Sequence, residues 1–321
     1  MFNEPRRIDT LKAEMERMIH MVPAEPLWNV FTREVIANLR QMRSPSQRLQ
    51  TRLRILDAGG LNPSPLNCEL RAYKAAWEVY LTAAFAIGLF DGPYGVELRA
   101  RLTGIDDDNF FSAISECFAA WYLAGRRRLE LVPRPKGQGA KCLEYSIKCE
   151  SGDINVEVKA PYRPLGDEFF WGDDADLLEK ALQSANRQFA KGQRNLLVVH
   201  PRLRLSIFPQ FCRTPIERAF IGEDVIRIPL NPATGGPAGP AHTAFKQSGR
   251  FVKLWPEPRH TRISAVLCLN EYEEGGEVKP RALMVHNPNA EMPLPRDMWQ
   301  GIPEFFLDSN QWRWSDEEAA A

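Results

Sequence analysis

The sequence has no excess of charge of either sign. Its 321 residues include 41 lysines and arginines and 41 aspartates and glutamates, so the formal net charge is zero. Nucleic-acid-binding domains are more often basic overall, because they neutralise phosphate groups. Any contact with nucleic acid must therefore come from a local basic patch.

The sequence also lacks the residue spacings that hold soft metal ions. None of the six cysteines forms a C-x-x-C pair, and none of the five histidines forms an H-x-x-x-H pair. Structural zinc sites usually show such spacings. The pattern therefore does not indicate a zinc site.

Long apolar segments are absent too. The longest run, Val79 to Phe90, is too short to span a bilayer and predicts a buried helix. Residues 1–7 lack the apolar core of a signal peptide. With no leader and no disulfide framework, we expect a cytoplasmic protein that does not contact a membrane.

The chain is about twice the length of a typical domain, which predicts two domains. Residues 1–105 form the first, because apolar residues recur at helical spacing over 11–21, 26–42 and 68–90. Residues 106–321 form the second. Its C-terminal part is a β-rich extension, with strands expected over 225–230, 263–269 and 281–286 and a Pro/Gly-rich loop over 229–240.

The second domain begins with alternating helices and strands. Three aspartates at 106–108 predict the start of a helix over 109–124, with Gly125 as its stop. A hairpin is expected over 142–160, followed by a helix over 177–191. The apolar run 195–200 is typical of a strand covered on both faces. This order predicts an α/β fold.

The hairpin carries the polar residues of interest. Residues alternate, so Glu144 and Ser146 share one face of the first strand, while Glu157 and Lys159 share one face of the second. Apolar side chains must oppose one another, and a register with Tyr145 opposite Val158 achieves this. That register places Glu144 opposite Lys159 and Ser146 opposite Glu157.

Two carboxylates and one ammonium group would then meet on a small patch. Close carboxylates repel, so one resists ionisation unless a cation lies between them. Mg²⁺ prefers oxygen ligands and suits the position. A neighbouring lysine orients water or stabilises negative charge, and the set suits phosphodiester hydrolysis.

Glu144 followed by Glu157-Val-Lys159 resembles the P-D…(D/E)-x-K signature of the restriction-endonuclease-like nuclease superfamily. The resemblance covers about residues 106–200. An upstream helix with an acidic residue, here Glu116, and a downstream helix with Gln188 also match that family. The chain departs from the signature at its first position, where Leu143-Glu144 replaces Pro-Asp.

The resemblance implies a restriction-endonuclease-like mixed sheet flanked by helices, and a metal-dependent nuclease. Glu144, Glu157 and the backbone carbonyl of Val158 would hold Mg²⁺, or Mn²⁺ in its place. Lys159 would position water, and Glu116 would bind a second ion or an ordered water. Gln188 would contact Lys159 or a phosphate. DNA is the expected partner, RNA is an alternative, and a homo-oligomer is compatible with the family.

Several alternatives remain open. Asp153 in the turn is a rival first acid, although the register favours Glu144. Glu116 and Gln188 each face either the site or solvent. The hairpin can also be an ordinary solvated surface with a weak ion pair. The chain can therefore be a non-catalytic nucleic-acid-binding or scaffold protein that keeps the fold, or an unrelated enzyme.

Overall fold

The fold was analysed in a computed structural model. It describes residues 25–42, 45–58, 64–133, 143–161, 174–200, 220, 223–227, 229–232, 234–236, 238–240, 242–246, 260–308 and 311–315. The helix expected over 11–21 lies outside these residues.

Helices come first along the chain. They are α2 (Pro26–Val30), α3 (Arg33–Arg40), α4 (Gln47–Asp57), α5 (Pro65–Ala86), α6 (Gly92–Thr103) and α7 (Asp107–Ala120), which continues as the π-helix η2 (Trp121–Arg126). A later helix, α8 (Asp174–Gln188), connects two strands, and η3 (Asp297–Trp299) is a short 3-10 turn.

The strands form one mixed sheet and a separate hairpin. The main strands are β1 (Leu131–Pro133), β2 (Tyr145–Ile147), β3 (Ile154–Lys159), β4 (Arg194–Val199), β7 (Ala265–Glu274), β8 (Glu277–His286), β9 (Glu304–Asp308) and β10 (Gln311–Trp314). They form an eight-stranded sheet in the order β1-β2-β3-β4-β7-β8-β9-β10. The second sheet pairs β5 (Glu223–Arg227) with β6 (His242–Lys246). The fold class is therefore α/β, as predicted.

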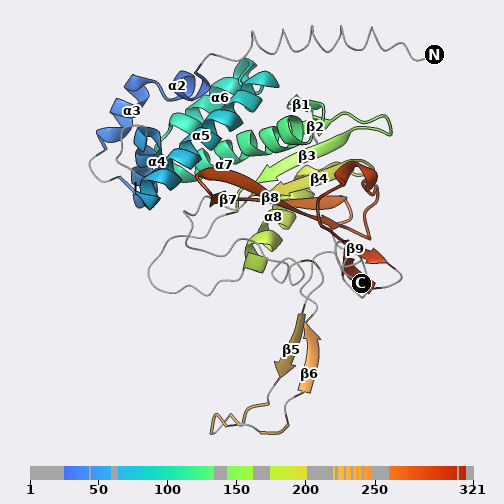
Figure 1. Ribbon diagram of the computed structural model, residues 1–321. Helices are drawn as coiled ribbons and strands as arrows, with labels where there is room; N and C mark the ends of the chain where they lie inside the picture. Colours follow the sequence, from blue (N-terminus) through green and yellow to red (C-terminus); the bar gives the residue numbers. More distant parts are fainter. Residues whose placement is uncertain are drawn as a thin grey trace, which may run out of the picture.

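Three parallel strands occupy the centre of the sheet. Strand β4 pairs in parallel with β3 on one side and β7 on the other. Its residues 195–199 are buried, which confirms the strand expected from the continuous apolar run. In Figure 1, α2–α7 gather on one side of the sheet, while α8 lies on the other.

The expected helices have different ends in the structure: those predicted over 68–90 and 177–191 are observed over 65–86 and 174–188. The helix predicted over 26–42 is interrupted, because the Thr32 side chain caps a new helix by accepting a hydrogen bond from the Val35 N–H. The helix predicted to stop at Gly125 continues to Arg126. Gly125 serves close packing instead: a Cβ atom there would lie 3.1 Å from the Trp121 ring. The positive φ follows at Arg128.

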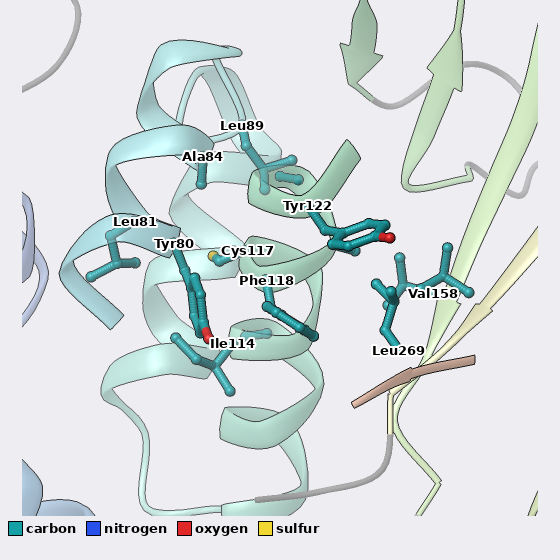
Figure 2. Close-up of a cluster of buried hydrophobic side chains, with 14 of the residues drawn as sticks. Tyr80, Leu81, Ala84, Leu89, Ile114, Cys117, Phe118, Tyr122, Val158 and Leu269 are labelled. Carbon is teal, nitrogen blue, oxygen red and sulfur yellow. The ribbon is translucent and has the colours of Figure 1, made fainter. Parts of the chain in front are cut away.

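One apolar core joins the N-terminal helices to the sheet. It includes Tyr80 and Leu81 of α5, Phe118 of α7, Val158 of β3 and Leu269 of β7. Figure 2 shows the helical side chains of this cluster beside Val158 and Leu269. The Phe118 ring lies 4.9 Å from the Tyr80 ring, measured between centroids. The domain boundary expected at residue 105 remains a prediction, and this core extends across it.

A buried polar cluster lies within the same layer. The Tyr80 hydroxyl donates to Glu271 Oε2 over 2.6 Å, and Ser115 Oγ lies 2.7 Å from His200 Nδ1. His200 Nε2 lies 4.0 Å from Glu271 Oε1. Burial raises the pKa of Glu271 to about 7 and lowers the pKa of His200 to about 3. Both groups are therefore predominantly neutral near pH 6.

Opposite pH effects follow from these two shifts. The raised pKa of Glu271 gives stability that is present below about pH 4.5 and is lost as the pH rises through about 7. The depressed pKa of His200 gives stability that is present above about pH 6.5 and is lost as the pH falls towards 3. Between pH 4.5 and 6.5 the two effects oppose one another.

We expect Glu271→Gln to stabilise the protein at pH 8 by up to about 3 kcal/mol, because the amide keeps an acceptor for Tyr80 and carries no charge. Near pH 4.5 the gain should vanish. Urea unfolding at pH 4.5, 6 and 8 measures the difference, with the exposed Glu277→Gln as control. A gain independent of pH would contradict the shift.

Candidate functional site

The hairpin register differs from the predicted one by two residues. Tyr145 pairs with Val156 and Ile147 with Ile154, not Tyr145 with Val158. The predicted register was wrong because the apolar pattern does not distinguish it from the observed one: Tyr145 lies opposite a valine in both registers. A shift of two keeps every side chain on its predicted face. Continuing the observed register beyond the strand brings Glu144 level with Glu157, whereas the predicted register placed it opposite Lys159.

Glu144 and Glu157 meet at this point. Glu144 is 9% exposed and Glu157 is 0% exposed. The two carboxyl groups are close enough to interact electrostatically, and Glu144 Oε2 accepts the Val158 N–H over 3.1 Å. Glu144 is therefore held at the end of β2 by the backbone of β3.

Lys159 completes the group. Its Nζ donates to Glu157 Oε1, and its side chain is 23% exposed. The Lys159 carbonyl accepts the His200 N–H on the β4 side of the strand. Successive carbonyls of a strand point to opposite edges, so the Val158 carbonyl points towards Glu144. Two carboxyl groups, one carbonyl and one ammonium group thus surround the same edge of β3.

The two carboxyl groups of Glu144 and Glu157 share a single ammonium group, that of Lys159. Burial, followed by the charge and hydrogen bond of Glu157, raises the pKa of Glu144 well above its ordinary value, although Lys159 opposes the shift. Burial and the neighbouring charge of Glu157 therefore favour the protonated form of Glu144 when no cation is bound. Among the residues described, Glu157 Oε2 is buried without a hydrogen-bond partner.

These donors fit a hard divalent cation. Carboxylate and carbonyl oxygens are the ligands that Mg²⁺ and Mn²⁺ prefer, and a cation would replace the proton between the carboxylates. Within the described part of the chain, no three His, Cys, Asp or Glu side chains form a group able to hold a metal ion. The protein would thus supply two carboxylates, with the Val158 carbonyl and water completing the shell.

Glu116 is buried rather than solvent-facing, with 3% exposure. Its carboxylate accepts two hydrogen bonds from Arg101, and it also accepts the Tyr94 hydroxyl. From the sequence, Glu116 was expected to bind a second ion or an ordered water, which remains a prediction. The observed contacts arise because α6, which carries Tyr94 and Arg101, packs against α7.

Gln188 lies in the last turn of α8 and is half-buried. It lines a hollow along that helix with Lys180, Gln183, Ser184 and Arg187. Its Oε1 is buried without a hydrogen-bond donor among the described residues. Contact of Gln188 with Lys159 or with a phosphate remains a prediction.

The rival acid Asp153 lies in the turn, where its half-exposed carboxylate pairs with Lys148. The structure thus brings Glu144, not Asp153, to Glu157. Two arginines near the hairpin donate hydrogen bonds within the protein: Arg127 to the Met298 and Gln300 carbonyls, and Arg194 to the Ser151 carbonyl. Arg134, Lys136 and Arg163 lie outside the described residues.

Sequence reasoning missed Arg101, Tyr94 and Tyr145 at this site. The Tyr145 hydroxyl donates to the Glu116 carbonyl over 2.6 Å, which ties α7 to β2 beside Glu144. Arg101 lies fifteen residues before Glu116, on a different helix. Helical spacing links residues three or four apart, so it gives no signal for this pair.

The comparisons with known proteins give little. No family model matches the chain, and no curated protein matches it. A structure of SfsA from Pyrococcus furiosus in complex with Ca²⁺ is similar at 16% identity and a TM-score of 0.21. The match covers 54% of this chain and 60% of that one, so it spans about three fifths of the SfsA chain. In the described part of the chain, no helix has the length and apolar character needed to cross a membrane.

Proposed function

We propose that this protein is a metal-dependent nuclease that hydrolyses phosphodiester bonds, with DNA as its substrate. The observation that carries the proposal is the pair of interacting buried carboxyl groups, Glu144 and Glu157, with the partly exposed Lys159 bound to Glu157. Burying two carboxyl groups together is unfavourable unless a proton or a cation joins them. An ordinary solvated hairpin surface would not bury them.

Each residue has a distinct task in this proposal. Glu144, Glu157 and the Val158 carbonyl would hold Mg²⁺ or Mn²⁺, which would supply Lewis acidity and neutralise charge at phosphorus. Lys159 holds Glu157 in place and, being partly exposed, orients the attacking water. The water oxygen bonds to phosphorus as the bond to the leaving oxygen breaks in line.

A non-catalytic role is the second candidate. The Lys159 ammonium pairs with Glu157 and the Val158 N–H donates to Glu144, so each carboxyl group has a partner within the protein. In that case the fold would bind nucleic acid or a protein without cleaving it. Retained DNA binding without Mg²⁺- or Mn²⁺-dependent cleavage would identify this role.

The test is nicking of supercoiled plasmid with Mg²⁺ or Mn²⁺. We expect Lys159→Met to lower the rate by at least about 100-fold, the scale for losing one group that stabilises charge. Lys148→Met is the matched control, because Lys148 lies on the same hairpin but pairs with Asp153. Equal activity of the wild type and Lys159→Met would remove Lys159 from the mechanism.

A structured RNA in the same assay tests the substrate class. Glu144, Glu157 and Lys159 would act at phosphorus, which DNA and RNA share, so cleavage of RNA alone would retain phosphodiester hydrolysis and make RNA the substrate in place of DNA. If the protein binds DNA but cleaves neither DNA nor RNA, the non-catalytic role is favoured.

A further inference from the structure

The third buried carboxylate near the site, Glu116, has its own fixed cation. Arg101 Nη1 donates to Glu116 Oε1 over 2.8 Å, and Arg101 Nη2 donates to Oε2 over 3.0 Å. Such a two-point arrangement is among the strongest carboxylate contacts that a protein side chain makes. The Tyr94 hydroxyl donates to Glu116 and accepts from Arg101 Nη2 over 2.7 Å.

The hydrogen bonds from Arg101 and Tyr94, called the clamp below, leave Glu116 little freedom to act as a metal ligand. Both of its oxygens are engaged by Arg101, and its side chain is 3% exposed. The pair is largely withdrawn from water, so separating Glu116 from Arg101 would leave a buried charge without its partner. Burial favours a neutral arginine, but the hydrogen bonds and charge of Glu116 outweigh it and raise the pKa of Arg101.

Glu116 nevertheless lies near Glu144, because its charge interacts with that carboxyl group. Its carbonyl accepts the hydroxyl of Tyr145, the residue next to Glu144. The clamp therefore fixes one end of a contact that runs from α6 through α7 to β2.

We propose that Arg101 is a built-in counter-ion that withholds Glu116 from metal binding, so that the site takes one divalent cation through Glu144 and Glu157. This inference rests on the proposed function. Arg101 and Glu116 are then positioning residues, because they act through Tyr145 and Glu144. The N-terminal helices contribute to the site through Arg101.

Mn²⁺ titration of the full chain by calorimetry tests the inference without any measurement of cleavage. We expect one Mn²⁺ per wild-type chain. Glu116→Gln should retain one Mn²⁺ with less than about tenfold loss of affinity, the low end for an outer-shell partner. Glu157→Gln should lose more than about 100-fold, which exceeds the range for outer-shell partners.

Arg101→Met frees the Glu116 carboxylate and should bind a second Mn²⁺ or bind the first more tightly. Arg101→Met leaves the buried Glu116 charge without its arginine partner, which destabilises the fold. The double variant Arg101→Met/Glu116→Gln removes that charge as well and serves as the control. The double variant should bind a single Mn²⁺. A merely structural salt bridge would not change the stoichiometry in this way.

The outcomes separate the two proposals. Two Mn²⁺ per wild-type chain, or equal losses for Glu116→Gln and Glu157→Gln, would overturn the counter-ion role and leave a metal site in place. No Mn²⁺ binding by the wild type would overturn both the proposed function and the counter-ion role. In that case the error would lie in the metal site assigned to Glu144 and Glu157.

Discussion

Replacing Glu157 with glutamine is expected to abolish metal-dependent cleavage and metal-dependent stabilisation together. Glu157 is fully buried, and its Oε2 lacks a fixed donor among the described residues. Glutamine has nearly the same shape but only one acceptor oxygen and no charge. The metal contributes several kcal/mol to the transition state, so cleavage should fall on the order of 1000-fold or more.

The same substitution has two opposing effects on the protein without metal. It removes a buried charge beside Glu144 but also the charge that pairs with Lys159, so the stability of metal-free Glu157→Gln should differ little from that of the wild type. Metal at about 100 times its dissociation constant should stabilise the wild type by about 2.7 kcal/mol and leave the variant unchanged. Thermal unfolding with and without MgCl₂ measures both effects.

Asp153→Asn is the matched control for this experiment. Asp153 precedes β3 on the same hairpin and is half-exposed, and it pairs with Lys148. Its replacement should leave both cleavage and the metal-induced shift intact. A Glu157→Gln protein that still cleaves DNA with Mg²⁺ would place the chemistry elsewhere in the molecule.

Removal of residues 1–105 is expected to prevent folding of the remainder, although the sequence predicts a boundary there. Helix α5 covers Phe118 of α7 and also contacts β7 and β8. Each large apolar side chain uncovered costs about 1.5–3 kcal/mol, and several are uncovered at once. The sum is comparable with the total stability of a typical domain, about 5–15 kcal/mol.

Denaturant unfolding of the 106–321 fragment measures this expectation. We expect no cooperative transition from the fragment and a single transition from the full chain. In the full chain, Phe118→Ala should cost about 3–5 kcal/mol, whereas Val96→Ala on the exposed side of α6 should cost little. A cooperative transition from the fragment would instead support the boundary at 105.

The hairpin shows how far local pattern determines a structure. Alternation of apolar and polar residues was sufficient to place Glu144, Glu157 and Lys159 on one side of their strands. It was insufficient for the register, since Tyr145 meets a valine at either Val156 or Val158. The choice depends on the length of the connection and on neighbouring strands, which the pattern of two strands does not contain.

The helices show a similar division. Thr32 could have been identified as a cap from its residue type, because its position before an acidic first turn is typical of a helix start. The extension of α7 to Arg126 had no such signal. The Trp121 ring lies over Gly125, four residues further along the same π-helix, and a Cβ atom there would lie 3.1 Å from that ring.

By itself, the sequence determined the α/β class, the buried central strand β4 and the face of the hairpin that carries the carboxylates, because periodicity and apolar runs are local properties. Only the tertiary structure decided the pairing of Glu144 with Glu157 and that of Glu116 with Arg101. These contacts join residues on different elements, so they depend on how strands align and helices pack. The charge balance of the site is likewise a property of the packed molecule.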